Sequence, residues 1–310
     1  MLTLFTIIHP LVDACSVSVL VAGGISFERV IAYNALAFAL QLPLGMLMDE
    51  WPRFTRLGFF LGTGMACAAA VAAALRLGGW GVLAVVCVGN AFFHLTAGKH
   101  ILETHEGRGG PIGLFISAGA LGLMAGQVWA AKAATICLAV FAAALGVCMV
   151  LAVAQSRRDA SFSPSLVSRK SLASHMTFKT GSFIPRLILV GLFILVAWRS
   201  WAGLFAGGRS TGGSALMMLV GAAVTFAGKV AGGYLAERVG RWKTTAFSVA
   251  GSAALAFFCE PTWVAPWLVL LFVAQLATGP VLSLVYEKAA RRGGRAFGLN
   301  CLGLFMGSLV

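Results

Sequence analysis

The chain has 310 residues, of which 59% are hydrophobic and 11% are charged, and its formal net charge at pH 7 is +13. The mean hydropathy is +0.91. Soluble domains are about 45–50% apolar and about 25% charged, so too little polar surface remains to cover a water-soluble globule of this size. The composition excludes a disordered chain and a nucleic-acid-binding protein, and it predicts a polytopic membrane protein.

Apolar runs of spanning length follow one another along the chain. A membrane helix needs about 20 apolar residues, and runs such as 65–75 lack the alternation of a transmembrane β-strand. We therefore expect an all-α helical bundle. Breaks at Gly, Pro and charged residues give eleven expected spans, at residues 4–24, 28–48, 57–75, 80–100, 110–130, 132–154, 186–206, 213–236, 244–259, 264–286 and 296–310.

The last run, 296–310, is shorter than the others. It would form about 22 Å of helix, against a hydrocarbon core of about 30 Å. A natural protein seldom stops halfway through the bilayer, so the sequence predicts a truncated chain that lacks roughly 35 residues of a second repeat. A short final half-helix packed against its neighbours is the alternative.

Positive charge gathers in alternate connections. Of the 23 Lys and Arg residues, 17 lie in or beside the loops that follow even-numbered spans. The positive-inside rule places these loops and the N-terminus in the cytoplasm, with the protein in the inner (plasma) membrane. Residues 1–24 lack a basic start and contain Asp13, so they do not resemble a cleavable signal peptide. The seven cysteines show no CxxC spacing, which argues against a disulfide framework and a zinc site.

The longest polar stretch divides the chain in two. We expect an N-terminal six-span half at 1–154, a cytoplasmic linker at 155–182 and a C-terminal half of five spans at 183–310. The halves repeat one another at an offset of 188 residues, which places Gly45, Asp49 and Arg53 over Gly233, Glu237 and Arg241. Parallel six-span repeats are a transporter architecture.

The segment GGYLAERVGRWK contains the second copy of this pattern. It resembles the loop signature of the major facilitator superfamily, Gly-x-x-x-Asp-Arg-x-Gly-Arg-Arg, with Glu237 in the acidic place. This resemblance implies a major-facilitator-type bundle and a gate built from the two copies of the signature. The expected gating residues are Gly45, Asp49, Arg53, Gly233, Glu237, Arg238, Gly240 and Arg241.

Within that superfamily, the first 130 residues resemble the fosmidomycin-resistance family of drug exporters. The matching segments are HPLVD, LQLPLGMLMDEWP, GNAFFH and GLFISAGALG, joined by WRSW in the seventh span. The sequence departs from the family at Leu95 and Thr96, where Pro-Glu is usual. The resemblance implies secondary active transport by alternating access, efflux of a small organic solute, and a central cavity lined by spans 1, 4, 7 and 10.

Ionisable residues inside these spans are functional hypotheses, because each costs at least a few kcal/mol. Asp13 lies in the first span and His9 one turn earlier on the same face, within reach of a carboxylate–imidazole contact. Such a pair can change its protonation with access to water. We predict that Asp13 and His9 couple transport to protons. A static polar pair that holds the first span to a neighbour is the alternative.

Four further residues are predicted to bind substrate: Asn90, His94, Arg199 and Gln275. Asn90 and His94 lie one turn apart, whereas Arg199 is near the middle of its span. Arg keeps its proton and needs an acceptor, either Asp13 or an anionic substrate group such as a phosphonate or carboxylate. Lys229 is expected to extend to the cytoplasmic surface.

The sequence has no Walker loop and no HExxH motif. The expected partners are a small-molecule substrate, protons and the lipid bilayer, without nucleic acid, cofactor or metal, and the protein is expected to be a monomer. Two alternative functions stay open. One is proton- or ion-coupled uptake of a small organic anion, and the other is a membrane-embedded enzyme that uses the His9/Asp13 cluster.

Overall fold

The structure is a computed structural model that describes residues 1–51, 53–158, 183–211, 214–258 and 264–309, which form helices and no strands. In chain order these are α1 (Leu2–Ala22), α2 (Phe27–Asn34), the π-helical turn η1 (Ala35–Ala39), α3 (Gln41–Glu50), α4 (Arg53–Ala74), α5 (Trp80–Thr104), α6 (Gly109–Arg158), α8 (Phe183–Thr211), α9 (Ala215–Val239), α10 (Arg241–Phe258), α11 (Val264–Gln275), α12 (Thr278–Lys288) and α13 (Gly293–Ser308). Seven helical stretches in this part of the chain are long and apolar enough to cross a bilayer. The expectation of an all-α, multi-pass membrane protein is confirmed.

Each of the eleven expected spans lies mostly on these helices, but four of them are not separate straight helices. Span 28–48 is α2, η1 and α3 in succession, and spans 110–130 and 132–154 form the single helix α6 with a kink at Ala133. Span 264–286 is broken into α11 and α12. Pro280 fits the first turn of α12, because backbone N–H groups there have no partner within the helix. The number of membrane crossings and the two-repeat arrangement stay predictions.

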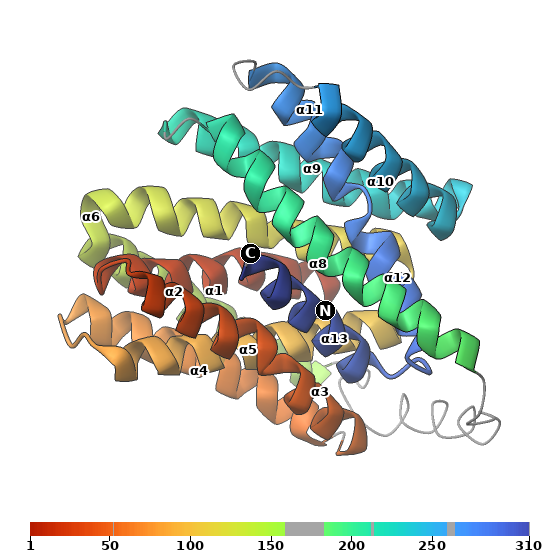
Figure 1. Cartoon of the computed structure of the whole chain (residues 1–310). Helices are drawn as coiled ribbons and strands as arrows, with labels where there is room; N and C mark the ends of the chain where they lie inside the picture. Colours follow the sequence, from red (N-terminus) through yellow and green to blue (C-terminus); the bar gives the residue numbers. More distant parts are fainter. Residues whose placement is uncertain (52, 159–182, 212–213, 259–263, 310) are drawn as a thin grey trace.

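The helices gather into two groups (Figure 1). Helices α1 to α6 lie together, and α8 to α12 form the second group, with α6 and α9 in contact between them. Helix α13 lies at the junction, where it contacts α3 and α5 of the first group and α8 of the second. Both groups therefore contribute to the surfaces on which the predicted functional residues stand.

The predicted linker falls mostly outside the described residues. Of 155–182, the structure describes residues 155–158, which continue α6. The division of the chain at this linker and the cytoplasmic position of the N-terminus stay predictions.

Helix α1 packs closely along α6, because a glycine of α6 faces it. A Cβ placed on Gly122 would lie 2.6 Å from the Cα of Pro10 and 2.8 Å from its carbonyl carbon. Backbone atoms cannot move aside as a flexible side chain can, so any larger residue would push the helices apart. The contact sits directly beside His9, and it therefore helps to hold that histidine against α6.

We expect Gly122→Ala to lower thermal stability in detergent, because overpacking in a close-packed interior costs about 1–3 kcal/mol. Gly146→Ala is the matched control on the same helix, since a Cβ there meets no atom within 4 Å. The control should leave the melting temperature unchanged or raise it slightly, because Ala favours helix by up to about 1 kcal/mol over Gly. Equal melting temperatures for the two variants would contradict this account of the α1–α6 contact.

Candidate functional site

Four polar side chains of α1 and α5 meet inside the first group of helices. The Asp13 carboxylate lies between two histidines: its Oδ2 is 3.2 Å from Nε2 of His9, and its Oδ1 is 3.3 Å from Nε2 of His94. The amide Nδ2 of Asn90 donates to the same Oδ1 at 3.1 Å. All four residues are buried, and Asp13 is 6% exposed. The structure thus brings together the four first-half residues that the sequence singled out.

Backbone oxygens hold the far side of each imidazole ring. Nδ1 of His9 lies 2.7 Å from the carbonyl oxygen of Phe115 on α6, and Nδ1 of His94 lies 2.9 Å from that of Asn90. Asn90 also donates to Ser16 Oγ at 3.1 Å. Sequence reasoning missed Phe115 and Ser16. A carbonyl acceptor can belong to any residue, so only the tertiary structure could identify Phe115.

His9, Asp13 and His94 lie close enough together to be considered as metal ligands. Nitrogen and oxygen atoms of His9, Asp13 and His94 lie within 4.8 Å of one another. However, the α6 backbone covers the cluster, since a Cβ on Gly119 would lie 2.6 Å from His9 Nε2 and 2.5 Å from Asp13 Oδ2. A metal bound by three protein atoms keeps an open position for at least a fourth ligand. The covered cluster fits protons better than a metal ion.

Arg199 stands on α8 in the second group and is 7% exposed. Its guanidinium donates to Thr278 Oγ1 at 2.8 Å and to Gln275 Oε1 at 3.4 Å, while its Nε has no hydrogen-bond partner. The two acceptors are the first residue of α12 and the last residue of α11, so the break between these helices presents both. The expected Arg199–Asp13 pair is not formed in this conformation. The guanidinium is instead held by neutral groups and keeps capacity for an anion.

Lys229 lies between these two regions. Its Nζ donates to the carbonyl oxygen of Ile116 on α6 at 3.3 Å, and the ammonium interacts electrostatically with both Arg199 and Asp13. The expectation that Lys229 extends to the cytoplasmic surface is therefore wrong. A carbonyl oxygen across the α6–α9 contact satisfies part of its charge instead.

At the end of the bundle that carries the signature sequences, Asp49 reaches from α3 to the start of α13. Its carboxylate accepts from the backbone N–H groups of Gly294 at 2.9 Å and Arg295 at 2.7 Å. The first N–H groups of a helix lack partners within the helix and attract negative charge. Lys99 donates to Asp49 at 2.7 Å and also pairs with Glu103. This contact joins the first group of helices to α13.

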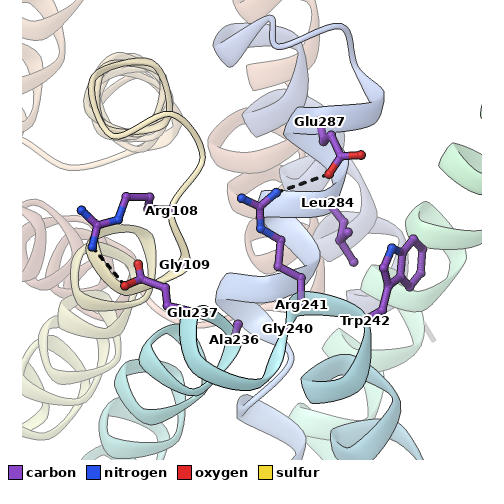
Figure 2. Close-up of a pocket in the computed structure, with 9 residues that line it drawn as sticks. All are labelled: Arg108, Gly109, Ala236, Glu237, Gly240, Arg241, Trp242, Leu284 and Glu287. Carbon is purple, nitrogen blue, oxygen red and sulfur yellow. Dashed lines mark hydrogen bonds and ion pairs between the residues drawn. The ribbon is translucent and has the colours of Figure 1, made fainter.

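Glu237 makes the reciprocal contact from α9 to the start of α6. It accepts from the backbone N–H of Gly110 at 2.9 Å and pairs with Arg108 at 3.1 Å (Figure 2). A second ion pair in the same view, Arg241 with Glu287 at 3.3 Å, stays within the second group of helices. Each copy of the signature thus places a carboxylate on a helix start in the other part of the chain.

Close backbone contacts accompany these carboxylates. A Cβ on Gly45 would lie 2.6 Å from the carbonyl carbon of Gly294, and one on Gly109 would lie 2.7 Å from the carbonyl oxygen of Gly233. Gly240 ends α9 with a φ of 103°, a conformation that favours glycine. Of the other predicted gating residues, Arg53 and Arg238 have exposed side chains. The glycines of the signature therefore let the two parts of the chain touch, while these two arginines face outward.

A cavity of about 610 Å³ opens between the two ion pairs of Figure 2. His105 lies in the nearby turn between α5 and α6, where partial burial and the Arg108 guanidinium lower its pKa. This histidine is therefore neutral at pH 7 and adds no charge to the gate.

The sequence singled out neither Lys99 nor Glu103. Their spacing of four residues at the end of the fourth span was the available signal.

No family model matches the sequence, and no curated protein matches it. Three solved structures share the fold over 99% of this chain: the fucose:proton symporter of E. coli (14% identity, 88% of that chain, TM-score 0.60), a second structure of this symporter in the outward conformation (14%, 89%, 0.55), and a bacterial homologue of the iron transporter ferroportin in the outward-facing state (15%, 89%, 0.52). This symporter is a major facilitator superfamily transporter. The chain therefore has the fold of these transporters.

We expect Glu237→Gln to open the signature end, because it weakens a contact between the two groups of helices. Loss of about 1 kcal/mol, as for an exposed ion pair, would raise the open population roughly fivefold. The measurement is maleimide labelling of the native, buried Cys301 from that side, with the other cysteines replaced.

Glu287→Gln is the matched control, since it removes an ion pair that lies within one group. Its labelling rate should equal that of the unmodified protein. An unchanged rate in Glu237→Gln would count against the gate, and so would an equal increase in both variants.

Proposed function

We propose that the chain is a secondary active transporter that moves a small organic solute by alternating access, with protons as the coupling ion. The observation that carries this proposal is a closed end joined by reciprocal contacts, Asp49 to α13 and Glu237 to α6, above buried charges in the interior. Contacts of this kind can break and re-form as rigid bodies rock. The fold shared with transporter structures supports the same function.

An enzyme built on the His9/Asp13 cluster is less well supported. Both carboxylate oxygens of Asp13 and all four ring nitrogens of His9 and His94 face protein partners. A general base or nucleophile needs an atom directed at substrate. The polar atoms of this cluster are directed at other protein groups instead. An exchange of protons between the cluster and water needs only a conformational opening, which suits coupling.

We assign proton coupling to Asp13 and His9, which lie in direct contact. In the occluded cluster, desolvation opposes the ionised carboxylate and the cationic ring stabilises it. Entry of water when the bundle opens weakens these two opposed effects by different amounts, so the proton affinity of the pair differs between conformations. The pair can therefore take up a proton in one conformation and release it in the other.

Substrate binding is assigned to the second group, at Arg199 and Gln275. Asn90 and His94, which the sequence also predicted to bind substrate, contact protein groups in this conformation. Arg199 is buried, has a free Nε and contacts only neutral acceptors. A buried cation without a counter-ion is costly, so an anionic group of the solute would complete this site. Lys229, which interacts with both Arg199 and Asp13, adds positive charge at the same place.

The direction we propose is efflux, as the sequence resemblance implies, with proton-coupled uptake as the alternative. In proteoliposomes the two differ in sign. Antiport concentrates solute on the side with more protons, whereas symport concentrates it on the side with fewer.

Asp13→Asn should abolish solute accumulation driven by a pH gradient, because the amide neither titrates nor stabilises a protonated His9. Exchange of a solute that the wild-type protein carries should persist without a gradient, since exchange needs only the rocking of a loaded carrier. His105→Gln is the control and should keep both activities. If Asp13→Asn instead lowers thermal stability and reduces exchange and accumulation equally, the pair is structural and the assignment is wrong.

Arg199→Lys should weaken binding of the carried solute about tenfold, or about 1.4 kcal/mol. Lys keeps the charge but loses the planar fork that binds an oxyanion with two hydrogen bonds. Arg186→Lys, at an exposed position of the same helix, should bind as the wild type does. Solute affinity measured by displacement in detergent decides the matter, and equal affinity in all three proteins would remove Arg199 from the site.

A further inference from the structure

The cluster around Asp13 contains a hydrogen-bond pattern that constrains its proton content. Each of its two imidazole rings has an oxygen in front of both nitrogens. For His9 these are the Phe115 carbonyl at 2.7 Å and Asp13 Oδ2 at 3.2 Å. For His94 they are the Asn90 carbonyl at 2.9 Å and Asp13 Oδ1 at 3.3 Å. Four ring nitrogens thus face four oxygen acceptors.

A neutral imidazole cannot satisfy two such acceptors. It has one N–H donor and one nitrogen lone pair, and both nitrogens donate only in the imidazolium form. Beside an ionised Asp13, either neutral tautomer would leave a lone pair directed at an oxygen lone pair, in one case at a carbonyl and in the other at the carboxylate. The Asn90 amide cannot relieve this, because its donor contacts are to Asp13 and Ser16. Each His–Asp contact therefore needs a proton of its own.

We propose that this conformation binds two protons, one between His9 and Asp13 and a second between His94 and Asp13. His94 is then a proton-binding residue in its own right, and not part of the substrate site. The inference rests on the proposed function for its role in transport, but the proton count follows from the contacts alone. It sets two as the largest number of protons that one transport cycle can exchange at the cluster.

Other charged and titratable groups face the cluster from neighbouring helices. Asp13 interacts electrostatically with Lys229 of α9 and with the phenol of Tyr33 on α2, and Arg199 of α8 interacts with Lys229. From α6 the cluster meets backbone: the Phe115 carbonyl and the close approach at Gly119. With two imidazolium rings and one carboxylate, the cluster has a charge of +1. This charge adds to the two nearby cations, and the two rings, whose centroids lie 4.4 Å apart, are held together by the Asp13 carboxylate between them.

The test is magic-angle-spinning NMR of protein labelled with 15N-histidine, reconstituted in phosphatidylcholine–phosphatidylglycerol bilayers at pH 8. The chain has five histidines. An imidazolium ring shows two protonated nitrogens, whereas a neutral ring shows one protonated and one unprotonated nitrogen. We expect two imidazolium rings in the wild-type protein. His9→Gln and His94→Gln should each remove one of them and so assign them.

Asp13→Asn should convert both rings to the neutral form, because it removes the anion that stabilises them. His105→Gln is the matched control: it should delete a neutral ring and leave both imidazolium rings in place. Fewer than two imidazolium rings in the wild type would overturn the proposal. A change in the His9 and His94 signals on adding EDTA would also overturn it, since a metal ion would then occupy the place of the protons.

The NMR result separates this inference from the proposed function. Two imidazolium rings together with intact gradient-driven transport in Asp13→Asn would leave the proton count standing and refute coupling at Asp13. Coupled transport together with a single imidazolium ring would do the opposite.

Discussion

A charge inside a bilayer is stable only where the protein itself supplies its partners, and this requirement determines how the first group of helices packs. Asp13 lies at the centre of α1 and receives hydrogen bonds from α1 and α5. Nδ1 of His9 in turn contacts the backbone carbonyl of Phe115 on α6. None of the three helices can move away without leaving a buried polar atom unpaired. The cluster therefore binds these helices together and also senses their separation.

The contacts at the signature end meet the same requirement, but at a place that water can reach. Backbone N–H groups at the starts of α6 and α13 have no partner within their helices, and Glu237 and Asp49 supply one from across the junction. Water can replace these carboxylates when the end opens, so the contacts cost little to break. The two are not equal, however. Asp49 is enclosed with Lys99, whereas Arg108 beside Glu237 is mostly exposed. Asp49 is thus the firmer of the two contacts.

Helix α6 connects the gate to the charged interior. The Gly110 N–H donates to the Glu237 carboxylate, the Phe115 carbonyl contacts His9, and the Ile116 carbonyl accepts from Lys229. Gly110 and Phe115 are five residues apart, which is about 7.5 Å along a helix. Because a helix segment of this length moves as a rigid body, we propose that release of its start at the signature end would also displace the acceptors of both interior groups. In this proposal, no further contacts are needed to connect the opening of the signature end with protonation of the Asp13 cluster.

The sequence by itself determined the class of the protein, because the bilayer admits few solutions: long apolar runs without alternation must be helices. It also singled out polar residues within the spans, since each ionisable group there is costly enough to stand out, as His9, Asp13, His94 and Arg199 do; the structure buries these four. The residues of the two reciprocal contacts, Asp49 and Glu237, were visible as two copies of one short pattern. These features depend on composition and short-range spacing, which a single chain shows directly.

Only the tertiary structure decided which groups meet. The sequence offered Asp13 as a partner for Arg199, but packing paired Asp13 with His94 and gave Arg199 the neutral side chains at the α11–α12 break. It placed Lys229 against α6 and put Phe115 behind His9 through a backbone carbonyl, a group that every residue carries. The kinks at η1 and Ala133 likewise follow from how helices fit one another. Distances between helices are set by packing over the whole bundle, and no local pattern in the sequence encodes them.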